Sequence, residues 1–323
     1  MQQIPNDIPI EWRSTLVDGQ GRSYKEFRTG LTPRYGLVWL QISLGYVVLA
    51  AVLTGLAMLD PGFPASIIAA AVGALLIGYT LAYLNNFFHE AAHYNLLPNR
   101  RANDRATNAA LGWLYGSTIA DYRRVHYQHH RALGTTQDSE NSYFDALRVR
   151  YLLAGLFGVK VLRTLGRHRR VAQGTPSENG SGRTRSLWWI VLCIGLHLTI
   201  AGGLWLAGFE AAGAAWLCGV VLVTPFFISL RQALEHRSEE AEAKLDYREV
   251  DHGAVNRLFG DGPVANTLGS AGFNRHALHH WDPGIPYTRL RDVERYLMNT
   301  PAAAEIQKRQ TTYSETFLRL LEL

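Results

Sequence analysis

The chain has 323 residues, of which 47% are hydrophobic, and a formal net charge of +5 at pH 7. Its two cysteines, Cys193 and Cys218, lie in apolar runs, which excludes a disulfide framework and a thiolate metal site. Charged residues are absent from long blocks and dense elsewhere. This segregation makes the basic excess a signal of membrane topology, with some attraction to anionic lipid, and gives no evidence for nucleic acid binding.

The N-terminal half contains one predicted transmembrane hairpin. Residues 1–34 are mixed and charged and lack the pattern of a signal peptide. Residues 35–59 and 65–88 carry no charge, and each run is long enough to cross a hydrocarbon core of about 30 Å at about 1.5 Å per residue. Asp60 and two prolines in the short connection between them signal a tight turn.

A second hairpin is predicted at 186–209 and 211–230, where only Glu210 separates two apolar runs. His197 lies in the middle of the first of these runs. We expect it to pack against another helix or to line a tunnel, rather than to bind a metal.

Three segments between the hairpins do not read as spans. Residues 106–120 are apolar but short, so we expect a re-entrant or interfacial helix. Residues 147–170 form a basic amphipathic stretch, which is typical of a segment on the membrane surface. Residues 172–185 are polar and rich in glycine and serine and are expected to form a solvated loop.

The distribution of basic residues predicts the topology. The four predicted spans and their two short connections contain no Lys or Arg, so all 32 basic residues fall on the other side of the membrane. The positive-inside rule makes that side cytoplasmic. We therefore expect a multi-pass protein, of the bacterial inner membrane, with both termini and the active site in the cytoplasm.

Eight of the 12 histidines fall in three five-residue motifs, HEAAH, HYQHH and HALHH. Offsets of three and four residues place side chains on one face of a helix. Eight imidazoles exceed the needs of one ion and suit two, with positions left open for oxygen or substrate. Imidazole ligands without thiolates suit Fe, Zn, Cu or Ni. The eight are His89, His93, His126, His129, His130, His276, His279 and His280.

Three other interpretations use fewer of these residues. HEAAH also matches the zinc-protease pattern, with Glu90 as general base. A carboxylate di-iron bundle needs two Glu-x-x-His motifs, which Glu90–His93 and Glu249–His252 would supply. A metal transporter would need ionisable residues within the spans, where only His197 occurs. Each of the first two leaves at least six of the eight motif histidines without a role.

The three motifs resemble the histidine boxes of the membrane fatty acid desaturase and hydroxylase superfamily, HxxxH, HxxHH and HxxHH, in the same order. The flanks YRRVH and HHWDPGIPYTRL are similar to the family's pattern too, and the resemblance covers roughly residues 35–320. It implies a non-haem di-iron centre with O2 as co-substrate. The chain has no fused haem domain with a His-Pro-Gly-Gly motif, so electrons are expected from a separate donor, of ferredoxin or cytochrome type, with its reductase.

The resemblance adds His236, at the matching position after the fourth span, to the eight box histidines as a metal ligand. It also suggests Gln232, one turn earlier, as a residue that holds a metal-bound water. A ligating histidine usually donates its other N–H to a carboxylate or carbonyl. The candidates for this role by proximity in sequence are Asp121, Asp138, Glu140 and Asp282. His252 and His168 are not expected to be ligands.

The expected fold is an all-α, four-helix transmembrane bundle of two hairpins with a cytoplasmic helical cap that carries the boxes. The whole chain is predicted to be one domain. Its parts are the N-terminal segment 1–34, the first hairpin 35–88, cap residues 89–185 with interfacial helices, the second hairpin 186–230 and cap residues 231–323.

The resemblance implies desaturation of a fatty acyl or similar lipid-like chain within a membrane. Hydroxylation, ketolation and alkene-forming decarboxylation share the same boxes and stay open. Residues 135–144, TTQDSENSYF, depart from the shorter acidic signature common in acyl-lipid members, which indicates an atypical substrate.

Overall fold

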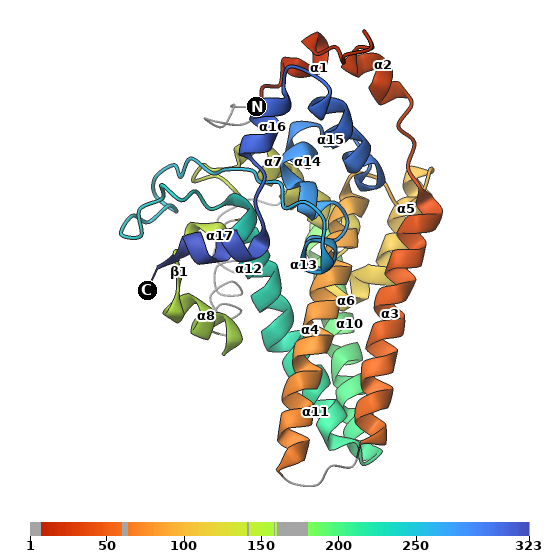
Figure 1. Ribbon diagram of the computed structural model, residues 1–323. Coiled ribbons are helices and arrows are strands. Elements are labelled where there is room, and N and C mark those ends of the chain that lie inside the picture. Colours follow the sequence, from red (N-terminus) through yellow and green to blue (C-terminus); the bar gives the residue numbers. More distant parts are fainter. Residues whose placement is uncertain (1–7, 60–63, 141, 158, 160–179, 323) are drawn as a thin grey trace.

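The computed structural model describes residues 8–59, 64–140, 142–157, 159 and 180–322 (Figure 1). Four helices are long and apolar enough to cross a membrane: Tyr35–Met58, Ala65–Ala92, Leu187–Leu206 and Glu210–His236. Within the described residues the only strands are the two-residue β1 (Leu147–Arg148) and β2 (Leu321–Glu322), which pair in parallel. The predicted all-α bundle with four membrane helices is confirmed.

The first hairpin consists of α3 (Tyr35–Met58) and α4 (Ala65–Ala92). Helix α4 is the centre of the bundle, because it packs against α3, α7, α11 and α12. It continues beyond the predicted end of the span at residue 88 and runs through most of HEAAH. His89 therefore lies on its last turn, and His93 is its C-cap residue.

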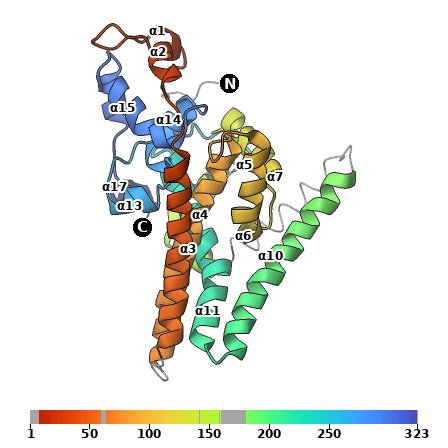
Figure 2. The same ribbon diagram turned by 90° about the vertical axis from the view of Figure 1, so that its right-hand side faces the viewer.

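The second hairpin consists of α10 (Gly180–Leu206), α11 (Glu210–Cys218), a π-helical turn (Gly219–Val223) and α12 (Thr224–His236). Figure 2 shows α10 beside α11 in this hairpin. Helix α10 begins at Gly180, so the expectation of a loop over 172–185 is wrong for 180–185, and its remainder lies outside the described residues. Helix α12, which ends the fourth span, finishes at His236 and not at the predicted residue 230, because polar residues after the apolar run continue the helix.

Glycines allow α4 to approach the π-helical turn closely. A Cβ atom on Gly78 would lie 2.4 Å from Cβ of Val223, and one on Gly219 would lie 2.9 Å from Cγ2 of Ile77. Small residues at membrane helix interfaces permit such close packing. The turn precedes Pro225, which lacks an N–H group, and the Thr224 hydroxyl donates to the Gly219 carbonyl at 2.9 Å.

The apolar segment 106–120 does not appear among the four candidate spans. It forms the end of α5 (Arg100–Thr107), a π-helical turn (Asn108–Gly112) and α6 (Trp113–Tyr115), and the chain then reverses at Gly116, whose φ of 62° is favoured by glycine. Helix α7 (Ile119–Ala132) follows, and Figure 2 shows α5 and α7 at the same end of the bundle. The segment therefore turns back at Gly116 and adds no fifth long apolar helix among the described residues, and its re-entrant or interfacial place in a membrane stays a prediction.

His197 packs against this segment, as one of its two predicted roles required. Its Nε2 lies 3.1 Å from the Leu114 carbonyl oxygen, and its ring lies between those of Trp113 and Trp216.

The remaining elements are short and gather at the end of the bundle where α4 and α12 finish (Figure 1). Part of the predicted surface stretch 147–170 forms β1 and α8, and residues 158 and 160–170 lie outside the described part. A core around Tyr24, Trp281 and Tyr296 joins the N-terminal helices to α14–α16. The bounds of these elements are α1 Trp12–Thr15, α2 Tyr24–Thr29, η2 Ser142–Phe144, α8 Val149–Leu156, α13 Pro263–Thr267, η4 Phe273–Arg275, α14 His276–Trp281, η5 Tyr287–Arg289, α15 Leu290–Met298, α16 Ala303–Lys308 and α17 Tyr313–Leu320.

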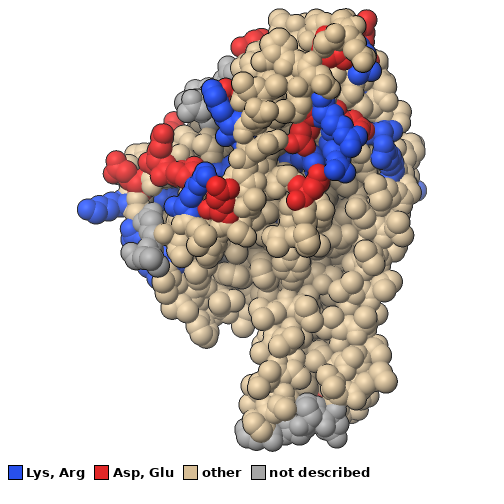
Figure 3. All heavy atoms as spheres, viewed as in Figure 1, with Lys and Arg blue, Asp and Glu red and all other residues tan. Residues whose placement is uncertain are grey.

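Charged side chains occupy the half of the molecule that contains these short elements. Figure 3 shows the opposite half of the bundle with almost no blue or red atoms on the visible face. An uncharged belt with exposed apolar side chains is the surface that lipid tails require.

Candidate metal centre

Four helices bring nine histidine side chains together at the charged end of the bundle. Helix α4 carries His89 and ends at His93, α7 carries the second box, α12 ends at His236, and α14 (His276–Trp281) carries the third box. The Thr118 side chain accepts the Asp121 N–H and caps α7, which begins only three residues after the reversal at Gly116. The segment 106–120 thus sets where the second box begins.

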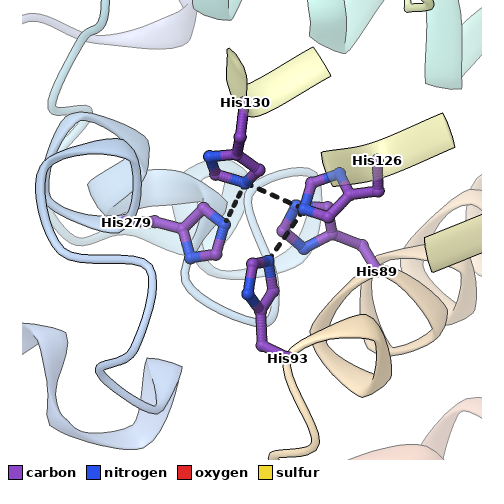
Figure 4. Close-up of side chains that lie close together, drawn as sticks. All are labelled: His89, His93, His126, His130 and His279. Carbon is purple, nitrogen blue, oxygen red and sulfur yellow. Dashed lines mark hydrogen bonds between the residues drawn. The ribbon is translucent and has the colours of Figure 1, made fainter. Parts of the chain in front are cut away.

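In one cluster, the five-histidine group, each histidine contributes one ring nitrogen, and these five nitrogens all lie within 4.8 Å of one another (Figure 4). Nε2 of His126 lies 2.8 Å from Nε2 of His93 and 2.9 Å from Nε2 of His130. Nε2 of His130 lies 3.2 Å from Nε2 of His279. The fifth member, His89, has both ring nitrogens buried without a hydrogen-bond partner in the described residues.

The second cluster, the four-histidine group, consists of His129, His236, His276 and His280. Nε2 of His276 lies 3.0 Å from Nε2 of His236 and 3.1 Å from Nε2 of His280. The two groups adjoin, because the ring centroids of His130 and His280 are 4.3 Å apart. The structure therefore brings together all nine histidines predicted as ligands and divides them five to four.

The donor set fits two metal ions. Nitrogens about 2.1 Å from one ion stand about 3.0 Å apart at a right angle and about 3.4 Å apart at a tetrahedral angle. The nitrogen separations of 2.8–3.2 Å fall at that spacing. Each neutral imidazole has one ring nitrogen with a free lone pair. Where several of these lone pairs point toward one another and too few N–H groups lie between them, a cation stabilises the arrangement.

Two of the four carboxylates predicted to orient the rings lie at the cluster. Asp138 lies 2.9 Å from Nδ1 of His129, and Tyr143 donates its hydroxyl to the same carboxylate at 2.5 Å. An acceptor at Nδ1 leaves Nε2 free to bind a metal. Glu140 Oε1 lies 3.5 Å from Nδ1 of His126, and its Oε2 accepts a hydrogen bond from Gln232 at 2.7 Å.

These contacts determine the electrostatics around the second box. Burial alone would lower the pKa of His129, but the negative charges of Asp138 and Glu140 raise it to about 9. Burial alone would raise the pKa of Glu140, but His129 and His126 hold it well below its usual value. Burial lowers the pKa of His130 and His279, so their rings stay neutral and able to bind a metal.

The other two carboxylates lie elsewhere, which corrects the expectation from sequence proximity. Asp121 accepts hydrogen bonds from Thr118 and Arg124. Asp282 accepts hydrogen bonds from Arg28 at 2.7 Å and Tyr24 at 3.0 Å, so it links the end of α14 to helix α2 of the N-terminal segment. Within the described residues, neither carboxylate is hydrogen-bonded to one of the nine rings.

Gln232 lies one turn before His236, as predicted, and both atoms of its amide are engaged. Nε2 donates to Glu140, and Oε1 accepts from the Ser142 hydroxyl. Its contact to a metal-bound water stays a prediction. Together with Asp138 and Tyr143, these contacts show that residues 135–144 support the histidine cluster.

The sequence did not point to Glu235, which has no exposed surface and lies beside the four-histidine group. Its Oε2 is 3.9 Å from Nε2 of His276, and its Oε1 accepts from the Tyr313 hydroxyl at 3.2 Å. Arg231, one turn earlier, lies 3.4 Å from this carboxylate and 3.6 Å from the Phe273 ring centroid. The sequence contains a signal for this pair, because Arg231 and Glu235 are four residues apart on one helix and directly precede His236.

Glu90 and His252 also occupy defined places. Glu90 is fully buried, and its Oε1 accepts from the Asn95 side chain and the Tyr287 N–H, each at 2.8 Å. The first box is thereby joined to the segment after the third. His252 packs among Tyr143, Tyr247 and Phe144 and belongs to neither histidine group. His168 lies outside the described residues.

Four apolar helices, with two adjoining groups of imidazoles gathered at one end, define an integral membrane protein with a histidine-rich candidate metal site. The family model described as fatty acid desaturase matches residues 65–312, and the chain belongs to that family. No match was found among curated proteins. The predicted resemblance to the desaturase and hydroxylase superfamily is therefore confirmed.

Proposed function

We propose that the protein is an oxygen-dependent desaturase that removes two hydrogens from an unactivated position of a fatty acyl or similar lipid-like chain. The observation that carries this proposal is the pair of adjoining histidine groups at the end of four membrane helices. Membership of the fatty acid desaturase family supports a lipid-like substrate and an oxidoreductase.

The proposed cofactor is a pair of non-haem irons, with the five-histidine group holding one and the four-histidine group the other. When bound, the irons supply the O2 activation that an unactivated C–H bond requires. Among the protein's own groups, Asp138 fixes the tautomer of His129, and Glu140 and Gln232 support the neighbouring ring of His126. Seven of the nine rings are buried, which keeps water from the site.

We propose that the histidine-bearing end faces the cytoplasm of a bacterial cell and that the four helices cross the inner membrane. The short connections at the opposite end contain no Lys or Arg, so the positive-inside rule supports this orientation. Both termini would then be cytoplasmic. Electrons would come from a separate ferredoxin- or cytochrome-type donor with its reductase, and the acyl chain from the surrounding lipid.

Product analysis tests the proposal. Full-length protein loaded with ferrous iron, in lipid nanodiscs with a reductant and O2, should consume O2 and yield acyl chains lighter by two hydrogens in mass spectra. Chains heavier by one oxygen would identify a hydroxylase. A carbonyl product would identify a ketolase, and loss of CO2 with a terminal alkene would identify a decarboxylase. Peptide cleavage without O2 consumption would support the zinc-protease alternative, although Glu90 is engaged by Asn95 and Tyr287.

A further inference from the structure

The five-histidine group reaches the surface of the protein at one place. Among the nine clustered rings only His93 and His130 are partly exposed, and both belong to this group. The segment 94–133, which forms α5, α6 and α7 around them, contains six arginines and two aspartates and so carries four net positive charges. The arginines are Arg100, Arg101, Arg105, Arg123, Arg124 and Arg131.

The residue after His93 is held in an unusual conformation. Tyr94 has a φ of 64°, in the left-handed region that non-glycine residues seldom adopt. Its ring is covered by two guanidinium groups, with the central carbon of Arg123 at 3.9 Å from the ring centroid and that of Arg100 at 4.8 Å. Arg123 also donates to the Ala92 carbonyl at 2.8 Å. The backbone beside His93 is thus fixed by a stacked arginine–tyrosine cluster.

Helix α7 carries a second group of arginine and tyrosine side chains. Residues 124, 127 and 131 share one helix face, because they are three and four positions apart. The Arg124 side chain is 74% exposed, and Tyr127 is 38% exposed. The Tyr127 ring centroid lies 5.7 Å from that of His93. An exposed aromatic ring flanked by arginines, directly against one of the clustered histidines, has the composition of a protein-docking surface.

We propose that this surface, the α5–α7 face, docks an acidic one-electron carrier protein that reduces the metal centre. The α5–α7 face consists of Tyr94, Arg100, Arg124, Tyr127 and Arg131. The inference rests on the proposed function, which requires an electron donor. Each docked carrier is oxidised by one electron. Removal of two hydrogens from the acyl chain consumes two such electrons, two protons and one O2, and forms two waters.

Charge complementarity and position select this partner. The arginine excess attracts an acidic protein and steers its approach. The exposed loop 239–251 has the opposite sign, with six acidic and two basic residues, and repels the same carrier. The α5–α7 face also borders the part of the cluster where two rings reach solvent, so a carrier that docks there lies close to the five-histidine group, which would hold the ion to be reduced.

Binding of a plant-type [2Fe–2S] ferredoxin with an acidic surface provides the test. Full-length, iron-loaded protein in nanodiscs of neutral lipid should bind this ferredoxin at low salt and release it as salt rises. Replacing two exposed arginines in R124Q/R131Q should weaken binding about five- to tenfold and flatten the salt dependence. The matched control is R291Q/R295Q, which removes two exposed arginines from α15 and should leave binding unchanged.

Turnover with two electron sources separates the docking surface from the site. R124Q/R131Q should need about five- to tenfold more ferredoxin for the same turnover rate, yet keep the wild-type rate with a small chemical reductant. Equal ferredoxin affinity in wild type and R124Q/R131Q would overturn the docking proposal. An equal loss of rate with both electron sources would also overturn it. The same holds if the wild-type protein binds anionic lipid nanodiscs but does not bind ferredoxin. A wild-type protein that binds ferredoxin through these arginines but oxidises no lipid would instead refute the proposed function.

Discussion

Replacing Asp138 with asparagine tests how the chain orients a proposed metal ligand. Asp138 is 3% exposed, lies 2.9 Å from Nδ1 of His129 and accepts the Tyr143 hydroxyl. Asparagine has nearly the same size but carries no charge, and its amide can donate as well as accept. The tautomer that leaves Nε2 of His129 free is then no longer favoured, so the four-histidine group should bind its ion more weakly.

The magnitude follows from the strength of this contact. Removal of the partner that orients a ligating histidine typically costs about 10- to 100-fold in metal affinity, or about 1.4–2.8 kcal/mol. In the metal-free protein the pKa of His129 is raised from 6.5 to about 9. That net shift, in which burial opposes the nearby negative charges, corresponds to about 3 kcal/mol in favour of the protonated ring. Asp138 and Glu140 both contribute to the charge effect, so Asp138 does not account for it alone.

A chelator competition read by metal content per chain measures the effect. D138N should release one of two ions at a chelator concentration about 10- to 100-fold lower than wild type. Tyr143→Phe is the matched control, because it removes the neighbouring hydroxyl but keeps the carboxylate, and it should shift release less than tenfold. Wild-type retention of both ions in D138N would refute the reasoning that Asp138 orients a metal ligand.

Three further outcomes follow from the same contacts. His129→Ala should insert into the membrane but lose metal and turnover, and a normal iron content with full activity would contradict the ligand assignment. Gly78→Val should lower the thermal unfolding temperature, since even its Cβ would lie 2.4 Å from Cβ of Val223, and an unchanged temperature would show that the helices separate without cost. The metal-free protein should lose stability as the pH falls through about 6.5. The reason is that burial lowers the pKa of His130 and His279, so the unfolded chain binds more protons; acid titration followed by circular dichroism measures this.

The four membrane helices and the eight histidines of the three motifs could be predicted because their signals are local. Long uncharged runs indicate the spans, and histidines three and four residues apart indicate a shared helix face. His236 needed the resemblance to a family, since one histidine after a span has no pattern of its own. The turn-back of the chain within 106–120 followed from a simple length argument.

The partners of the carboxylates could not be predicted, because they depend on packing between distant segments. Asp282 is two residues from His280, yet it binds Tyr24 and Arg28 of the N-terminal segment. Asp138 reaches His129 because the chain turns back after α7. The buried place of Glu235 likewise depends on Tyr313, far away in the sequence.

The central claim is that the two histidine groups hold two irons, and iron content measures it most directly. Full-length protein purified under anaerobic conditions with ferrous iron should contain two irons per chain by elemental mass spectrometry. His276→Ala, in the four-histidine group, should contain fewer. One metal ion per chain, or two ions of a metal that supports no O2 consumption, would contradict the account.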